Sequence, residues 1–397
     1  MQRQRTWRLC AAALAITALT ACKTELGPGD GDGGTNPNPN PKPYPTLDGK
    51  APQSFSLSSI DGKAANTAES FDAAIAQDAN FIAVDLVMSK DGELVALASP
   101  DITDITDVSS RSVYANRKTV RQIDGQSHQG WFASDFTLVE LQSLRAKLTG
   151  SSAPPTNATT GRILSLNDVI AYVKRQRKTV GLYLQTLNPT YHSQQGLAME
   201  DKLVAAFTAA GYTQETAPVL VRSLEVAHLK ALRAKTQVRL VQMINGDPKL
   251  GSDGQILMNL PYGQPYDFTL AGTSTTYAQM VTADGLAQIK TYANGISPWK
   301  PFVISARYLD KNGDGQPDDL NNDGLRDYRD REMMPPTNLV TLAHAAKLFV
   351  HPWEYRNDVT LLASDFKGKV AAEYKLFYEV GVDGVFSDSP SDANKAR

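Results

Sequence analysis

The sequence predicts an α/β protein, a (β/α)8 barrel of the TIM type. Short apolar runs alternate with segments of helical periodicity from about residue 53 onward, which indicates a parallel sheet with helical crossovers. About eight strands fit the pattern, and the roughly 345 residues beyond residue 52 suit an elaborated barrel. A doubly wound open sheet is the alternative that the alternation leaves open. In a barrel, the functional site is expected at the carboxyl ends of the strands.

The predicted elements follow in chain order. Strands are expected at 81–87, 93–98, 180–185, 219–222, 239–244, 302–305, 348–351 and 382–387, where short runs are rich in β-branched or aromatic residues. Helices are expected at 70–77, 138–147, 166–177, 199–210, 225–234, 277–294, 338–346 and 371–380. The strand and helix segments therefore alternate along most of the chain.

Residues 1–22 have the features of a secretory signal. Three arginines precede an apolar run from residue 11 to 21, which is too short to span a bilayer. The run ends in LTAC (19–22), which resembles the lipobox of bacterial lipoproteins, so Cys22 is the expected lipidation site. An ordinary cleaved signal with an incidental cysteine is the alternative. Acylation would anchor the chain to a membrane, and Lys23 favours the outer membrane, on its periplasmic or cell-surface side.

Residues 23–52 are rich in Gly, Pro and Asn and are expected to form an extended linker. The barrel is then expected to span residues 53–397. Cys10 would be removed with the signal, which leaves no cysteine pair for a disulfide. The formal net charge of −2 argues against a nucleic-acid partner, because binding a phosphate backbone needs a basic surplus.

Six segments carry a resemblance to a known family. They are KAANTAESFDAAI (63–75), FIAVDLVMSKDGELVALASPDITDITDV (81–108), DFTLVELQSL (135–144), VGLYLQT (180–186), LVTLAHAAKLFVHPWEYRND (339–358) and GVDGVFSDSPSD (381–392). Together they resemble the glycerophosphodiester phosphodiesterase family, specifically its long periplasmic branch. The resemblance implies a TIM barrel that hydrolyses glycerophosphodiesters with a divalent metal, commonly calcium, and two histidines as acid and base.

The positions that this resemblance assigns to chemistry have mostly changed. Ser56, Leu57 and Ser58 stand in place of the family's His-Arg-Gly motif, and Ala98 stands in place of the second histidine. Of the expected metal-ligating carboxylates, three are replaced and one remains. The replacements are Ala65, Ala83 and Gln185, and the retained carboxylate is Asp85. Loss of a general acid or base lowers a rate by about 10² to 10⁴, and loss of the metal removes a Lewis acid as well.

We therefore expect a catalytically inactive barrel that acts as a binding or scaffold protein. Its mouth would bind a polyol, sugar or lipid head group, and a protein partner is also compatible with this role. The expected ligand-binding residues are Ser56, Asn66, Asp85, Gln185, His351 and Trp353. The alternative is an active metal-dependent glycerophosphodiester phosphodiesterase in lipid metabolism.

An acidic segment at 310–330 predicts a calcium-binding insertion. The pattern D-x-N-x-D-G-x-x-D occurs twice in tandem, with oxygen-bearing side chains at alternate positions and a glycine at the sixth place. The expected Ca²⁺ ligands are Asp310, Asn312, Asp314, Asp318, Asp319, Asn321, Asp323, Asp327 and Asp330. A solvated acidic loop without metal is the alternative. A structural role is expected for the ion rather than a sensor role, because extracellular sites of this kind are typically weak and the calcium concentration outside the cytosol is steady.

Overall fold

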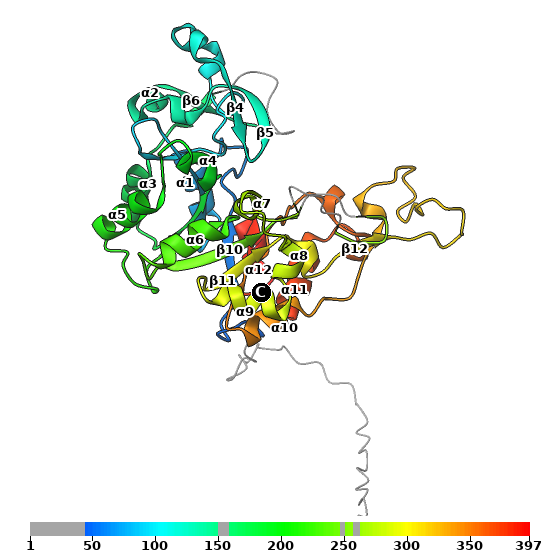
Figure 1. Cartoon of the computed structure of the whole chain (residues 1–397). Helices are drawn as coiled ribbons and strands as arrows, with labels where there is room; N and C mark the ends of the chain where they lie inside the picture. The colour runs from blue at the N-terminus through cyan, green and yellow to red at the C-terminus, as the bar shows by residue number, and fades with distance from the viewer. Residues whose placement is uncertain (1–43, 150–158, 247–250, 257–262) are drawn as a thin grey trace, which may run out of the picture. The chain divides into compact units, whose positions relative to one another are not determined.

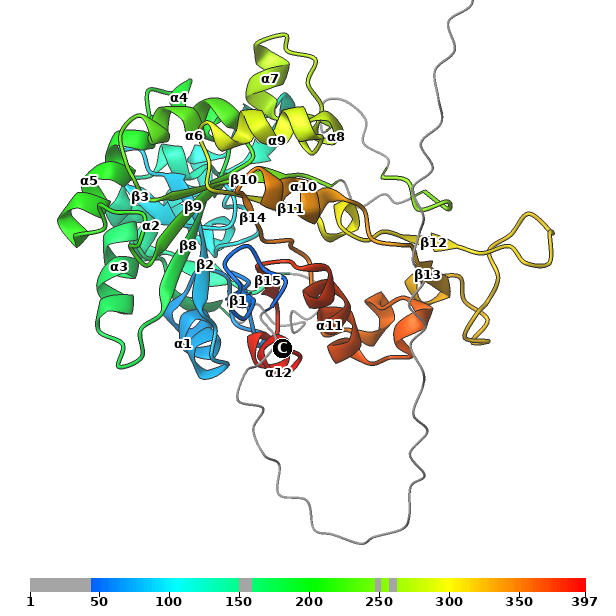
Figure 2. The same ribbon diagram turned by 90° about the horizontal axis from the view of Figure 1, so that it is seen from below.

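The computed structural model describes residues 44–149, 159–246, 251–256 and 263–397, in which parallel strands are surrounded by helices (Figures 1 and 2). Within these residues the main sheet has the strand order β14-β11-β10-β9-β8-β2-β1-β15, with β3 (Leu94–Ala96) antiparallel beside β2. Its parallel strands are β1 (Gln53–Ser56), β2 (Phe81–Met88), β8 (Gly181–Thr186), β9 (Val219–Ser223), β10 (Arg239–Ile244), β11 (Gly295–Pro298), β14 (Phe349–Val350) and β15 (Gly384–Ser387).

The two ends of this sheet meet between β14 and β15. The Asp383 N–H donates to the Val350 carbonyl (2.9 Å), and the Tyr355 N–H donates to the Phe386 carbonyl (3.1 Å). Tyr355 also forms a parallel bridge with Ser387. The sheet is therefore a barrel, as the sequence predicted, and the doubly wound alternative is wrong.

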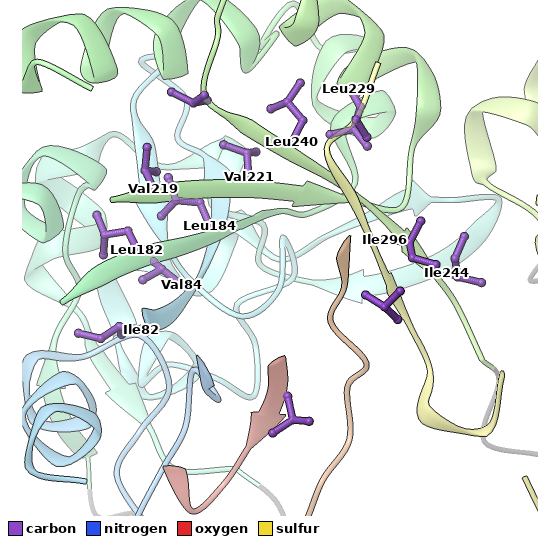
Figure 3. Close-up of a cluster of buried hydrophobic side chains, with 14 of the residues drawn as sticks. Ile82, Val84, Leu182, Leu184, Val219, Val221, Leu229, Leu240, Ile244 and Ile296 are labelled. Atoms are coloured by element: carbon purple, nitrogen blue, oxygen red, sulfur yellow. The ribbon is translucent and has the colours of Figure 1, made fainter. Parts of the chain in front are cut away.

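Helices cover the outer face of the barrel (Figure 2). The α-helices of the described residues, most of which lie on this face, are α1 (Ala68–Ala76), α2 (Leu138–Ser143), α3 (Leu166–Lys174), α4 (Pro189–Ser193), α5 (Glu200–Ala210), α6 (Val226–Arg233), α7 (Tyr266–Leu270), α8 (Tyr277–Met280), α9 (Ala283–Lys290), α10 (Leu339–Ala345), α11 (Val370–Val380) and α12 (Pro390–Lys395). The outward side chains of the strands pack against them, as Figure 3 shows for Val84, Leu184 and Val221. Each such buried aliphatic side chain contributes about 1.5–3 kcal/mol.

One predicted strand is misplaced. The sequence predicted a helix at 277–294 and a strand at 302–305, whereas the structure has two short helices, α8 and α9, followed by β11 (Gly295–Pro298). Residues Lys300–Phe302 form a 3₁₀ turn, and Val303 and Ile304 are buried beside it. The apolar run of residues 302–304 is therefore buried without being a strand. The predicted helix at 138–147 also ends early, because Arg145–Lys147 pair as β6 with β7 (Thr159–Arg162).

Two further hairpins extend from the barrel. β4 (Thr119–Ile123) pairs with β5 (Gln126–Gly130), and β12 (Ala306–Tyr308) pairs with β13 (Arg331–Met333). The acidic segment 310–330 connects the second pair and projects from the barrel (Figure 1). Among the described residues, no helix combines the length and the apolarity needed to cross a membrane.

The end of the predicted linker belongs to the folded part. The Leu47 N–H donates to Asp383 Oδ1 (2.6 Å), and Thr46 is buried. Residues 44–52, the end of the predicted linker, thus contact the chain just before β15, whereas residues 23–43 lie outside the described residues. The composition of residues 44–52 did not reveal this contact, because Pro and Gly are as common in packed turns as in tethers.

Candidate functional site

The lumen of the barrel is filled by aromatic and apolar side chains. Phe55, Tyr183 and Phe386 form its centre, with ring centroids 5.0 Å apart for Phe55–Tyr183 and 4.7 Å apart for Tyr183–Phe386. The lumen cluster consists of Phe55, Phe81, Ala83, Tyr183, Leu220, Val241 and Phe386. Because this interior is packed, a ligand on the mouth side must bind above it, at the carboxyl ends of the strands.

Asn66 and Asp85 are held together at the end of β2. The Asn66 amide donates to Asp85 Oδ2 (3.2 Å), and its oxygen accepts from the Asp85 backbone N–H (2.8 Å). Asn66 adopts a φ of 62°, a left-handed conformation that asparagine tolerates, just before the Thr67 cap of α1. These two predicted site residues therefore contact each other.

Asp85, Gln185 and Arg222 form one row across three neighbouring strands. Asp85 pairs in register with Gln185, and Gln185 pairs with Arg222. The side chains alternate with the outward residues Val84, Leu184 and Val221, so all three point to the lumen side. Arg222 is a residue that the sequence analysis did not single out. A charged residue in the otherwise apolar run VLVRS (219–223) was the signal that could have revealed it.

The other predicted ligand-binding residues are placed differently. Trp353 packs against the lumen cluster, and its indole Nε1 is buried without a hydrogen-bond partner among the described residues. His351 is 3% exposed inside the lumen, where its Nδ1 lies 3.1 Å from the Tyr183 hydroxyl. Ser56 is fully buried and accepts a hydrogen bond from the Ala83 N–H (3.2 Å), which leaves no exposed surface for a ligand.

His351 was expected at the mouth, but it borders a cavity at the opposite end of the barrel. That cavity also contacts Gln53, Arg239 and Asp383, which lie at or before the amino ends of their strands. Burial lowers the pKa of His351 well below its usual range, and the charges of Arg239 and Arg222 lower it further. His351 is therefore neutral at pH 7, which suits a packed histidine better than a proton carrier.

A polar cavity of about 110 Å³ lies on the mouth side, next to the row. Its walls come from the ends of β8, β9 and β10 and from the β4–β5 turn. They include Asp124, Gln185, Asn188, Glu225, Asn245 and Tyr266. Asn188 donates to Asp124 Oδ2 (2.7 Å), while Asp124 Oδ1 is buried without a partner among the described residues. The cavity is therefore rich in hydrogen-bonding groups and in carboxylates.

Two carboxyl groups that line this cavity, and a third on α7 whose charge acts on one of them, have raised pKa values. Burial raises the pKa of Glu225 to about 7; the Thr190 hydroxyl and N–H, which donate to it, oppose the rise, while the charges of Asp124 and Asp267 add to it. Burial also raises the pKa of Asp124 and that of Asp267. Glu225, which is 3% exposed, was also missed by the sequence analysis, because its protonation depends on long-range neighbours.

The residues of the mouth do not fit the family's divalent metal. Asp85 provides the one carboxylate at the positions assigned to ligands, and it is already bonded to Asn66. Hard cations need several oxygen ligands and usually more than one carboxylate. Within the described residues, no three His, Cys, Asp or Glu side chains are grouped so that they could hold an ion. We therefore derive no catalytic step that uses a metal here.

The acidic segment repeats one hydrogen-bonding pattern twice. The carboxylate of Asp310 accepts from the N–H groups of Asp314 (3.1 Å) and Gly315 (2.9 Å), and that of Asp319 accepts from the N–H groups of Asp323 (3.2 Å) and Gly324 (2.8 Å). Both glycines have φ near +80°, as the sharp turn at the sixth place requires.

Other predicted ligands in this segment already have partners. Arg326 pairs with Asp319 (3.3 Å), and Arg329 pairs with Asp323 (2.6 Å). Asp330 is fully buried and accepts from the Leu320 and Asp327 N–H groups (2.9 Å each). No three of these described carboxylates are grouped so that they could hold an ion. Calcium binding therefore stays a prediction, for which the first loop has the freer carboxylates.

The closed parallel sheet and its surrounding helices define a (β/α)8 barrel. The polar residues described above define a site at the carboxyl ends of its strands. Residues 51–392 match the Glycerophosphoryl diester phosphodiesterase family, and the chain belongs to this family. The resemblance stated from the sequence segments is thereby confirmed.

The chain is similar to named phosphodiesterases over most of their length. It is 29% identical to glycerophosphodiester phosphodiesterase GDPD6 of Arabidopsis thaliana, covering 81% of this chain and 79% of that protein. It is 25% identical to the Haemophilus influenzae glycerophosphodiester phosphodiesterase, over 82% of this chain and 84% of that protein. A putative glycerophosphoryl diester phosphodiesterase of Silicibacter pomeroyi has the same fold, with a TM-score of 0.54 and 15% sequence identity. The match covers 89% of this chain and 97% of that structure.

Proposed function

We propose that this barrel is a non-catalytic binding protein that holds a small polar ligand, such as a polyol or a lipid head group, at its mouth. The observation that carries this proposal is the composition of the row on β2, β8 and β9. It presents one carboxylate, one amide and one guanidinium, namely Asp85, Gln185 and Arg222. These groups can donate and accept hydrogen bonds, but they provide neither a metal site nor a histidine base.

An active phosphodiesterase is the second candidate, and one observation favours it. Glu225 borders the mouth cavity with a pKa of about 7, the value at which a general acid or base works well near neutral pH. Both of its oxygens accept hydrogen bonds from Thr190, however, so the carboxylate is held by the protein. We therefore place this activity second.

Hydrolysis of glycerophosphocholine separates the two functions. The full chain would be incubated with millimolar Ca²⁺ or Mg²⁺, and release of glycerol phosphate would be measured beside an active family member. We expect no product above the protein-free blank. A turnover of about one per second, the lower end of ordinary enzyme rates, would overturn the binding role. Loss of that turnover in Glu225→Gln would then identify the proton carrier.

We further propose that the protein is an outer-membrane lipoprotein acylated at Cys22, with Ca²⁺ ordering the acidic segment. Cys22 lies outside the described residues, so its support is the sequence LTAC alone. The calcium proposal is supported by the repeated loop pattern and by Asp310 and Asp314, which form no ion pair among the described residues. A protein partner stays an open part of the scaffold role.

A further inference from the structure

We propose that the cavity at the amino end of the barrel is a second binding site, which takes a small organic carboxylate held by the guanidinium of Arg239. This cavity has a volume of about 290 Å³ and lies opposite the mouth. The packed lumen cluster separates the two ends of the barrel. A ligand at the amino end is therefore independent of the function proposed for the mouth.

Two parts of the chain form the walls of this cavity. One wall belongs to the barrel, and the other belongs to the segment that precedes β1. The barrel contributes Gln53, Arg239, Phe349, His351 and Asp383, and the segment contributes Leu47, Asp48, Lys50 and Ala51. The segment is held in place, because the Leu47 N–H donates to Asp383 Oδ1 (2.6 Å). A ligand here would contact both parts at once.

Arg239 is directed to the lumen side of β10 and has unused hydrogen-bond donors. It lies two residues before Val241, a member of the lumen cluster, and its guanidinium carbon is 5.5 Å from the ring centroid of Phe81. Its Nη2 donates to the Ala217 carbonyl (3.3 Å), whereas its Nε is buried with no partner among the described residues. The carboxylate of Glu215 acts on it only at longer range. Unpaired donors on a desolvated charge are costly, so they indicate a missing acceptor.

The other charged residues around the cavity already have partners. Lys50 Nζ lies 3.2 Å from Asp48 Oδ2, and Asp383 Oδ2 lies 2.9 Å from His344 Nε2. Arg239, in contrast, forms no ion pair in the part of the chain that the structure describes. The cavity therefore has one positive charge without a counter-charge, which favours an anionic ligand.

The remaining wall residues favour a carboxylate with a short apolar tail. A guanidinium fork pairs with a carboxylate through two parallel hydrogen bonds. Because His351 Nδ1 bonds to the Tyr183 hydroxyl, Nε2 is the ring nitrogen left for a ligand. Leu47, Ala51 and Phe349 offer apolar surface, which a purely inorganic anion would leave uncovered. A cation would be repelled by the unpaired guanidinium.

The experiment uses butyrate as the probe and compares two arginines of the chain. Arg239→Met removes the proposed anchor, and Arg239→Lys keeps the charge without the fork. Arg233→Met is the matched control, because Arg233 Nη2 also donates to a backbone carbonyl, that of Val238, and its Nε is also buried with no partner in the described part of the chain. Arg233 lies at the end of the outer helix α6, however.

Binding to the full chain would be measured by ligand-observed NMR and by thermal shift. Butyramide serves as the neutral isostere of butyrate, and inorganic phosphate serves as an oxyanion without the tail. Hydrogen exchange of the backbone amides of residues 44–52, with and without butyrate, reports whether the ligand lies at this cavity.

We expect butyrate to bind the wild type and Arg233→Met, and butyramide and phosphate to bind much more weakly. Affinity for butyrate should fall roughly ten- to a hundredfold in Arg239→Met and less in Arg239→Lys, because hydrogen bonds to a charged group are lost. Butyrate should slow hydrogen exchange of residues 44–52 in the wild type, because it joins this segment to the barrel, and should not do so in Arg239→Met.

Each contradicting result is separate. The proposed site is wrong if butyrate does not bind the wild type, if it binds Arg239→Met as tightly, or if it leaves the exchange of residues 44–52 unchanged. Equally tight binding of butyramide would overturn the carboxylate, and equally tight binding of phosphate would overturn the apolar tail. Should Arg239→Met fail to fold, Arg239→Lys decides, because an arginine that serves only packing predicts unchanged butyrate affinity in that variant.

Discussion

At the residue scale, Glu225 shows how burial changes the proton affinity of a single carboxyl group. Its side chain is 3% exposed, and the only donors that it meets among the described residues belong to Thr190. Ionisation of such a group is opposed by desolvation and by neighbouring negative charge, here that of Asp124 and Asp267. The folded state therefore holds the proton more tightly than the unfolded state does.

This difference predicts how stability depends on pH. Between about pH 4.5, the ordinary value, and about pH 7, the folded protein keeps a proton that the unfolded chain has lost, so stability falls as pH rises through this window. The loss is on the order of 3 kcal/mol. Denaturation with urea from pH 5 to 8 should show a flatter profile for Glu225→Gln. Glu379→Gln, at an exposed position on α11, is the control, and identical profiles for wild type and Glu225→Gln would contradict the prediction.

Part of the site follows from the sequence and part does not. Asn66 and Asp85 were predicted because they stand in segments that resemble the family, and the structure shows them in contact. Arg222 and Glu225 were missed, because their importance comes from burial and from neighbours that are distant in the chain. His351 was expected at the mouth but lies inside the lumen, because a strand residue at the mouth and one inside the barrel have the same local sequence pattern.

At the scale of elements, the long periodic segments were easy to predict and the short ones were not. β2 and β8 are apolar runs in the sequence, and the structure confirms that both are strands. β11 has the sequence GISP, which is too short and too poor in β-branched residues to be recognised. Its neighbours at 302–304 look more like a strand, although the proline at 301 and tertiary packing place them in and after a 3₁₀ turn.

The two acidic loops should differ in their response to calcium. Asp319 and Asp323 are paired with Arg326 and Arg329, whereas Asp310 and Asp314 form no ion pair among the described residues. Ca²⁺ must displace an arginine in the second loop, which costs binding energy, so we expect the first loop to dominate.

Calorimetry with Ca²⁺ on the full chain would test this expectation. Asp310→Asn with Asp314→Asn should abolish most of the heat, and Asp319→Asn with Asp323→Asn should reduce it less. Removing Ca²⁺ with a chelator should make the segment 310–330 more sensitive to protease in the wild type. Absence of Ca²⁺ uptake by the wild type would show that the segment is a solvated acidic loop.

At the scale of the whole molecule, the barrel is stabilised without a disulfide, largely by apolar packing. The lumen cluster and the larger cluster beneath the helices are both made of buried apolar side chains. With Cys10 and Cys22 as the only cysteines in the sequence, both before the barrel, no disulfide can link its strands. Two of the positions that the family resemblance assigns to metal ligands lie in or beside this packing, because Ala83 belongs to the lumen cluster and Gln185 lines the mouth cavity.

The proposed anchoring at Cys22 sets how far the barrel could lie from a membrane. If Cys22 is acylated, residues 23–43 would be the tether to the folded part, which includes residues 44–52, and would span about 65 Å as a polyproline-like stretch. A diacylated Cys22 would hold this tether firmly, because two acyl chains bind a bilayer far more strongly than one.

Cys22→Ser should therefore move the protein from the membrane pellet to the soluble fraction, and should abolish incorporation of labelled palmitate. Cys10→Ser, in the apolar run of the same signal, should leave both unchanged. Retention of Cys22→Ser in the membrane would mean that another part of the chain anchors the barrel.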